Sequence, residues 1–144
     1  MSETKTAYTK PLPDMRPDGQ AFWAGTREHK LLLPAGQDGK PFWYPRALAP
    51  GTLDDVQWIE SRGEGTVYTY SVHFIGPSKA YKGDPPHTVA LVDLDEGVRM
   101  MTNIVKDEEG YPSIDPDQVS IGMRVRVVFH DVTDEITLPK FTPV

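Results

Sequence analysis

Residues 88–99, Thr-Val-Ala-Leu-Val-Asp-Leu-Asp-Glu-Gly-Val-Arg, join a nearly continuous apolar run to a turn signal. An apolar run of this length is typical of a buried strand, so residues 88–94 are predicted to form a central strand. Residues 95–97, Asp-Glu-Gly, predict a turn, because glycine tolerates the backbone angles that turns need. The turn leads into a further predicted strand at residues 98–105.

Short strands are predicted on both sides of this unit. Residues 66–75 and 124–132 alternate apolar with polar side chains, and shorter segments at 56–60 and 136–141 also read as strands. Five or six short strands with glycine-marked bends predict a small closed barrel, whose interior is filled by side chains. One face of the 66–75 strand is predicted to be apolar and to belong to the core, with these residues: Tyr68, Tyr70, Val72 and Phe74.

The N-terminal part differs in character. Residues 1–16 are polar and rich in proline, which predicts either a mobile tail or an arm that becomes ordered on a partner subunit. Asp18 follows a proline and is a candidate cap for a helix over residues 18–29. Leu31-Leu32-Leu33 then predicts a short buried strand.

Residues 36–52 have the spacing of a small zinc ribbon, in which two C-x-x-C pairs hold one tetrahedral zinc ion. The chain contains no cysteine, so no thiolate ligand is available. Asp38-Gly39 is a hairpin signal, so we expect a metal-free hairpin with Phe42-Trp43-Tyr44 as its second strand. The four positions that would hold the metal carry other residues: Gly36, Gly39, Ala49 and Thr52.

Composition limits the possible functions. The 144 residues carry a formal net charge of −6, which disfavours binding to nucleic acids and to anionic membranes. No apolar run approaches the roughly 20 residues that span a bilayer, and the N-terminus lacks the apolar segment of a secretory signal. A soluble cytoplasmic protein is expected.

The chain lacks the common catalytic motifs, and its four histidines show no metal-ligand spacing to one another. His73 is either a general base or a hydrogen-bonded surface residue. The aromatic cluster at Phe42–Tyr44, with Arg46 beside it, is either an interface or packs on the N-terminal helix. The long loop over residues 76–86 carries two lysines and a tyrosine that suit phosphate and base contacts, although a solvated loop fits equally well.

Seven stretches of the chain, taken in order, carry a family resemblance: FWAG (22–25), LLL (31–33), YPR (44–46), GEGTVY (63–68), VALVDLDEGVR (89–99), IGMRV (121–125) and LPKF (138–141). With these stretches the chain resembles the acyl-CoA-associated OB-fold proteins that carry an N-terminal rubredoxin-like zinc ribbon, long described as a domain of unknown function. The resemblance runs from about Phe22 to Pro143.

The resemblance implies a mainly β fold with an N-terminal helix, a ribbon-like hairpin that is metal-free here, and a five-stranded OB-type barrel. The expected divisions are a flexible arm at 1–16, a helix and degenerate zinc-ribbon segment at 17–58, and an OB-fold domain at 59–144.

The resemblance also implies a non-catalytic accessory subunit of a thiolase-superfamily enzyme, a thiolase or an aldolase acting on a CoA ester. The expected partner is a thiolase-like catalytic subunit in a heterotetramer of two plus two, which this chain stabilises and whose acyl-CoA site it helps to form. The chain itself is expected to bind no metal or cofactor, since the coenzyme A ester is the substrate of the complex. The candidates for contact with coenzyme A or the partner are Phe42, Trp43, Tyr44, Arg46, His73, Lys79, Tyr81 and Lys82.

Two other hypotheses remain open. An OB-type module that binds single-stranded nucleic acid would stack bases on aromatic side chains, although the charge of −6 counts against it. A stand-alone enzyme would use His73 or His130 for acid–base chemistry.

Overall fold

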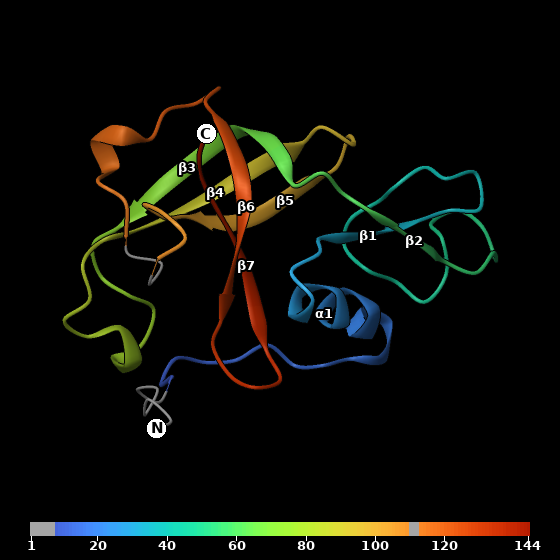
Figure 1. The fold of residues 1–144 in the computed structure, drawn as a ribbon, viewed down its shortest axis with the longest axis horizontal. Helices are drawn as coiled ribbons and strands as arrows, with labels where there is room; N and C mark the ends of the chain where they lie inside the picture. The colour runs from blue at the N-terminus through green and yellow to red at the C-terminus, as the bar shows by residue number, and fades with distance from the viewer. Residues whose placement is uncertain (1–7, 110–112) are drawn as a thin grey trace.

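The computed structural model describes residues 8–109 and 113–144. Five strands form a closed barrel in the order β3-β4-β5-β7-β6, and β1 and β2 form a separate two-stranded sheet. Figure 1 shows this small sheet projecting to one side of the barrel, with α1 below the junction. The predicted mainly β fold with a five-stranded barrel is confirmed. The elements in chain order are η1 (Pro17–Gly19), α1 (Gln20–Arg27), β1 (Leu32–Ala35), β2 (Gln57–Glu60), β3 (Glu64–His73), η2 (Lys79–Tyr81), β4 (His87–Leu94), β5 (Arg99–Ile104), η3 (Pro116–Gln118), β6 (Arg124–Asp131) and β7 (Thr137–Pro143).

The predicted central strand is β4, which pairs antiparallel with both β3 and β5. Its side chains alternate strictly, with every second residue buried, because one face of the strand lines the barrel interior. β5 meets β7 at a single parallel pair, Ile104 with Phe141. The buried barrel core includes Val67, Ala90, Val92, Leu94, Met100, Ile104, Val125 and Phe141.

A β-bulge changes which residues of β3 face the core. The register shifts between Val67 and Thr69, so Val67 pairs with Val92 and Tyr70 pairs with Ala90. Both partners on β4 are buried, so the inward positions on β3 are three residues apart here rather than two. Tyr68 lies in the bulge and is exposed, so its predicted place in the core is wrong. Phe74 follows the end of β3 and is also exposed, so its predicted place in the core is wrong as well.

The N-terminal helix is shorter than the predicted 18–29. Asp18 lies inside a 3₁₀ turn that Pro17 begins, and no side chain caps the N-terminus of either η1 or α1. The predicted capping role of Asp18 is therefore wrong. Phe22 and Thr26 are buried as expected for one apolar helix face. Beyond the helix, the ring of His29 bonds to Asp131, which fastens this segment to the end of β6.

The ribbon-like segment folds differently from the predicted hairpin. β1 pairs with β2 over four residue pairs, whereas Phe42-Trp43-Tyr44 forms no strand. Pro41 and Pro45 flank these aromatic residues and lack the amide hydrogens that a ladder needs. Only an isolated bridge from Ala35 to Pro41 remains of the expected pairing.

Turn hydrogen bonds close the loops where a zinc ribbon would hold its metal. The carbonyl of Gly36 accepts bonds from the amide of Gly39 and from the side chain of Gln57, and the carbonyl of Ala49 accepts from Thr52. Within residues 8–109 and 113–144, no group of three or more His, Cys, Asp or Glu residues is arranged to hold a metal ion.

Residues 8–16 of the predicted arm lie against this chain's own barrel, and residues 1–7 fall outside the described residues. The ammonium of Lys10 pairs with Asp84 in the β3–β4 loop at 3.0 Å, and the Tyr8 ring lies edge-on to His130 of β6. Among the described residues there is no helix with the length and apolar character needed to cross a bilayer.

Candidate functional site

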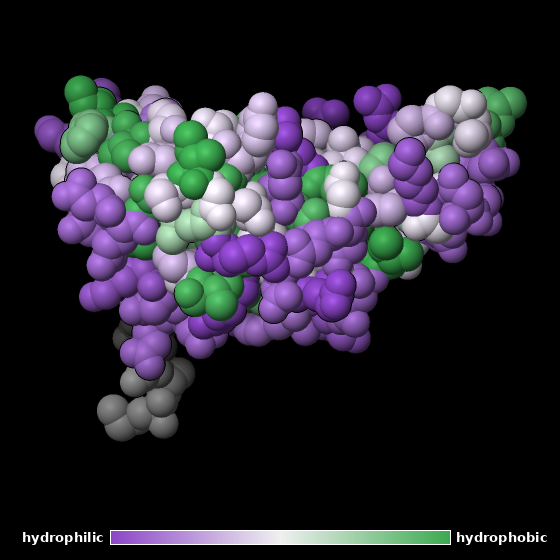
Figure 2. All heavy atoms as spheres, turned by 90° about the horizontal axis from the view of Figure 1, so that it is seen from above, coloured by the Kyte–Doolittle hydropathy of each residue, from purple (hydrophilic) through white to green (hydrophobic). Residues whose placement is uncertain are grey.

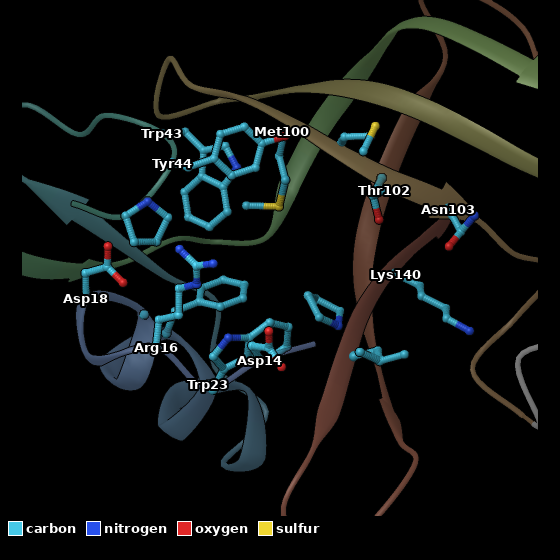
Figure 3. Close-up of a pocket in the computed structure, with 16 residues that line it drawn as sticks. Asp14, Arg16, Asp18, Trp23, Trp43, Tyr44, Met100, Thr102, Asn103 and Lys140 are labelled. Atoms are coloured by element: carbon cyan, nitrogen blue, oxygen red, sulfur yellow. The ribbon is translucent and has the colours of Figure 1, made fainter. Parts of the chain in front are cut away.

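An open groove of about 520 Å³ lies where β5 and β7 diverge, and α1 and the loop before β2 form its other wall. Figure 3 shows Trp23, Trp43 and Tyr44 gathered at one end, with Asn103 and Lys140 at the other. Most of the lining is apolar, from aromatic, methionine and proline side chains. The main apolar lining residues are Phe22, Trp23, Trp43, Tyr44, Pro45, Met100, Met101, Leu138 and Pro139.

The aromatic end of the groove is built by packing between the helix and the loop. Trp43 lies against Phe22 of α1 with 5.1 Å between ring centroids, and Tyr44 lies 5.3 Å from Trp43. Tyr44 remains 56% exposed at the rim. The packing interpretation of the aromatic cluster therefore holds for Trp43, whereas Tyr44 faces outward.

Two residues of this lining each have a buried polar atom. The indole Nε1 of Trp43 and the hydroxyl of Thr102 have no hydrogen-bond partner within the described parts of the chain. A buried polar atom that lacks a hydrogen-bond partner costs about 1–3 kcal/mol of folding free energy. A hydrogen bond between either atom and a ligand or a water molecule would therefore be favourable. The groove thus offers a large apolar surface with a few polar contacts, which is the usual character of a small-molecule site.

One of the loop candidates, Tyr81, lines a second cavity, which shares lining residues with the first. Tyr81 of η2 stacks on His87 of β4 at 5.9 Å, and His73 stacks on the same ring at 5.1 Å. Burial, and next the proximity of His73, lower the pKa of His87. Lys79 and Lys82 are exposed and do not line this cavity.

Phe42 and Arg46, like His73, Lys79 and Lys82, line neither of the two cavities. Phe42 lines a shallow hollow beside the ribbon loops. Arg46 is exposed and lies with Asp18 and Trp58 on the outside of α1. Trp43 and Tyr44 therefore lie together in the first groove, and Tyr81 and His73 both stack on the ring of His87. The structure does not join the eight candidates into one site.

No set of nucleophile, base and orienting group is present among the described residues. His73 bonds to the hydroxyl of Ser71 at 3.2 Å, but both side chains are exposed. No carboxylate in the described ranges hydrogen-bonds to His73, so a Ser–His–carboxylate arrangement is incomplete there. His130 contacts Lys140, with 3.0 Å between Nδ1 and Nζ.

The outer face of the barrel carries paired charges. Arg99 covers the ring of the bulged Tyr68 at 3.4 Å and also bonds to Asp93. Arg124 makes two hydrogen bonds of 2.8 Å to Asp95. These arginines lower the pKa of Asp93 and Asp95, chiefly through the hydrogen bonds. A base stacking on Tyr68 would have to displace Arg99.

Several residues of the two cavities were missed by sequence reasoning, notably Lys10, Thr102 and Lys140. Lys140 lies within the stretch LPKF, but nothing in a strand sequence indicates that its ammonium is buried beside a histidine. Lys10 belongs to a stretch interpreted as an arm, so its contact with the β3–β4 loop had no sequence signal.

Residues 58–130 match the family model described as "ChsH2, C-terminal OB-fold domain". The chain belongs to this family. The family resemblance and the OB-type barrel expected from the sequence are thereby confirmed. ChsH2-family relatives include the probable enoyl-CoA hydratase alpha subunit of Thermomonospora curvata, which is 30% identical over 99% of this chain and 42% of the relative.

Two further relatives have informative names. The 3-oxo-4,17-pregnadiene-20-carboxyl-CoA hydratase alpha subunit of Mycobacterium tuberculosis is 32% identical over 85% of this chain and 37% of that subunit. A DUF35 domain-containing scaffold protein of Methanothermobacter thermautotrophicus is 33% identical over 69% of this chain and 70% of the relative. The chain therefore spans about two fifths of the two hydratase subunits, at 42% and 37% of their lengths.

Solved structures agree with the assignment. One chain of the structure described as "Ltp2-ChsH2(DUF35) aldolase" superposes with a TM-score of 0.76 at 30% identity, over 92% of this chain and 98% of that chain. A DUF35-family protein of unknown function from Sulfolobus solfataricus gives a TM-score of 0.56 at 14% identity, over 89% of this chain and 86% of that chain. The second likeness supports the fold alone.

Proposed function

We propose that this chain is a non-catalytic accessory subunit of an enzyme that acts on a CoA ester. The observation that carries the proposal is the superposition, at a TM-score of 0.76, on nearly the whole of one chain of an Ltp2-ChsH2(DUF35) aldolase. A relative named as a scaffold and two named as hydratase subunits support a role beside other chains.

The proposed role has a second part, in which this chain helps to form the acyl-CoA site of the complex. The geometry of the groove fits this part. Its aromatic and thioether side chains suit an apolar acyl group, and Asn103 and Lys140 provide polar groups at the other end.

The catalytic partner is proposed to be a thiolase-superfamily subunit, a thiolase or an aldolase, in a cytoplasmic complex of two plus two. Tyr44 and Met101 stand at the rim of the groove, 56% and 60% exposed, and are proposed to contact that partner or the acyl chain. Figure 2 shows other apolar patches separated by hydrophilic side chains on the face that it displays.

Co-expression with the thiolase-like protein encoded nearest to this chain tests the pairing. The two proteins are expected to co-elute on size exclusion, and the catalytic subunit is expected to be less soluble and less active alone. If the catalytic subunit is equally soluble and active without this chain, and the two never co-elute, the proposal is wrong.

A double variant, Tyr44→Ala with Met101→Ala, tests the rim. We expect it to weaken co-elution or to raise the KM for the CoA ester, because each side chain loses its apolar surface. Leu53→Ala is the matched control, since Leu53 is 89% exposed and does not line the groove. Equal effects of the double variant and the control would count against a role of the rim.

The nucleic-acid alternative is less well supported. Arg99 and Arg124 are each engaged by a carboxylate on the barrel's outer face, and the net charge is −6. Salt-dependent binding of a single-stranded oligonucleotide would favour this alternative over the subunit role.

A further inference from the structure

The groove beside α1 exposes the edges of two barrel strands. Neighbouring residues of β5, from Met100 to Asn103, line it, as do residues 138–140 of β7. Side chains of a strand alternate between its two faces, so a run of neighbouring lining residues means that the strand edge itself borders the groove. In the described part of the chain, β5 pairs with β7 only at Ile104 and Phe141. The two edges therefore diverge across the groove without a ladder between them.

The hydrogen-bond register of β5 shows which main-chain groups point into the groove. In an antiparallel pair every second residue bonds to the neighbouring strand, and the residues between them direct their amide and carbonyl to the other side. The amide of Leu94 donates to the carbonyl of Val98 at 2.8 Å, and the register with β4 continues unbroken from there. The even-numbered residues of β5 therefore bond to β4. The odd-numbered residues, including Met101 and Asn103, point away from it.

Contacts of the neighbouring strand agree with this alternation. The amide of Val105, another odd-numbered residue, donates to the carbonyl of Phe141 on β7 at 2.8 Å. On β7 the alternation starts from the amide of Val144, which donates to β6, and it directs Pro139 toward the groove. Proline has no amide hydrogen, so Pro139 offers only an acceptor. Across residues 8–109 and 113–144, no segment pairs with the edge of β5 at Met101, whose amide and carbonyl both remain open.

The open edge is short. β5 runs from Arg99 to Ile104, where contact with β7 closes the barrel. Met101 and Asn103 are the outward-directed positions that line the groove. A peptide strand of the usual length, about five or six residues, would extend past this edge at both ends. One pair of hydrogen bonds to a short chain that carries two amides fits the edge better.

The pantetheine arm of coenzyme A is a chain of this kind. Its β-alanyl unit has an N–H at one end and a carbonyl at the other, as an amino-acid residue in a strand has. The arm is uncharged, which suits a groove lined mostly by apolar side chains. Figure 3 shows Met100, Thr102 and Asn103 following one another along β5, away from Trp43 and Tyr44. A thioester bound along β5 would have its acyl end at these aromatic side chains.

We propose that the open edge of β5 binds the pantetheine arm of the CoA ester. The amide of Met101 donates to the β-alanyl carbonyl, and the carbonyl of Met101 accepts the β-alanyl N–H, as in an antiparallel strand pair. This inference rests on the proposed function, which supplies the CoA ester, and it names the part of the ester that this chain holds. The contacting groups all belong to this chain, so binding needs no partner subunit.

Three hexanoyl thioesters that differ in their amides test the proposal: hexanoyl-pantetheine with two, hexanoyl-N-acetylcysteamine with one, and S-ethyl hexanethioate with none. Each is titrated into the full chain, and the fluorescence of Trp23 and Trp43 in the groove reports binding. The affinity is expected to fall in this order by about two- to tenfold for each amide, the size of a net hydrogen bond. Equal affinities would overturn the proposal, because the acyl group alone would then account for binding.

Met101→Pro removes the amide hydrogen, and it removes no bond to β4 because that amide points away from β4. We expect it to weaken both amide-containing thioesters by about two- to tenfold and S-ethyl hexanethioate by less than about twofold. Met101→Leu is the matched control, since it changes the side chain and keeps the amide. Its effect should be the same for all three thioesters. Equal losses for all three thioesters in Met101→Pro would also overturn the proposal.

The wild-type chain provides a readout that needs no variant. On saturation with hexanoyl-pantetheine, the amide proton of Met101 should move downfield in the NMR spectrum. The amide of Thr102, which bonds to β4, is the internal control and should stay near its original position. A Met101 amide that does not move at saturation, or no saturable binding of hexanoyl-pantetheine, would overturn the proposal.

A capped peptide of alternating valine and threonine distinguishes the other ligand that a strand edge can bind. Binding of this peptide as tight as that of hexanoyl-pantetheine would assign the edge to a peptide strand and overturn the pantetheine site. Failure of the pantetheine site would leave the pairing with a catalytic subunit intact, since that pairing is measured by co-elution. Saturable binding of hexanoyl-pantetheine without co-elution would instead support the site and contradict the subunit role.

Discussion

Glu96, in the turn between β4 and β5, holds the linker before β3 through Ser61. The Ser61 hydroxyl donates to Oε1 of Glu96 at 2.6 Å and accepts the amide hydrogen of Gly63 at 2.9 Å. The other carboxylate oxygen accepts the amide hydrogen of Arg62 at 3.1 Å. One side chain thereby links the barrel to the small sheet at the point where β2 leads into β3.

Glu96→Ala is expected to lower the free energy of unfolding by about 1–3 kcal/mol, because Ser61 and the Arg62 amide lose a charged acceptor. Urea denaturation measures the change. Glu135→Ala is the control, since its side chain is exposed in the β6–β7 turn, and it should change stability by less than about 0.5 kcal/mol. Equal effects of the two substitutions would mean that the link contributes nothing.

Gly63→Ala is expected to be strongly destabilising for two reasons that can be separated. Gly63 has φ +72°, and a Cβ there would overlap Cγ1 of Val127. The left-handed backbone costs about 1–2 kcal/mol, and the overlap about 1–3 kcal/mol more. Gly39→Ala carries only the first cost, because Gly39 has φ +81° with open space around it.

Thermal and urea unfolding of both variants give the comparison. The Gly63 substitution should cost more than the Gly39 substitution, and adding Val127→Ala should recover part of the difference. If both glycine substitutions cost the same, steric contact with Val127 has no role.

Lys140→Met is expected to stabilise the chain at neutral pH by up to about 3 kcal/mol, the cost implied by the lowered pKa. The folded-state pKa of Lys140 is about 8, below the usual 10.5. Between these two pH values the unfolded chain keeps a proton on Lys140 that the folded chain has released. The penalty is complete below pH 8 and disappears as the pH rises toward 10.5. Among residues 8–109 and 113–144, the charged and titratable groups that line the cavity with Lys140 are Tyr8, Lys10, Tyr81, Asp84, His87 and His130.

The stability difference between Lys140→Met and wild type is therefore expected to be largest at pH 7 and to shrink above pH 8. Guanidinium unfolding at several pH values measures it, and Lys79→Met serves as the exposed control. A difference that stays constant with pH would contradict a buried ammonium at this position.

Metal analysis of the purified protein is expected to find no stoichiometric zinc, and a chelator should not lower its Tm. The chain has no cysteine, and turn hydrogen bonds to the carbonyls of Gly36 and Ala49 close the loops where the metal would lie. A structural zinc ion contributes folding free energy directly, so its removal would be visible as a lower Tm. One zinc per chain together with such a decrease would contradict the prediction.

Much of the barrel follows from local sequence pattern. The nearly continuous apolar run of residues 88–94 and the turn at Gly97 predict β4 and the start of β5, because an apolar run of this length is typical of a buried strand. Trp43 and Tyr44 are contact candidates because they belong to a run of three aromatic residues, and both line the groove beside α1.

Other features depended on contacts between distant segments. The bulge at Tyr68 has no signal in β3 itself, because the register is set by pairing with β4. Similarly, β1 pairs with β2 rather than with residues 42–44. The prolines on either side of residues 42–44 lack the amide hydrogens that strand pairing needs.

The sequence by itself determined the strand pattern, the loss of the zinc ligands and the family, because each depends on residue types in a fixed local order. Only the tertiary structure decided that Lys10, His130 and Lys140 line one cavity. Their proximity arises from barrel closure and from the packing of residues 8–16 against the β3–β4 loop. The lowered pKa of Lys140 follows from the same closure, because burial beside a like charge is a property of the folded chain.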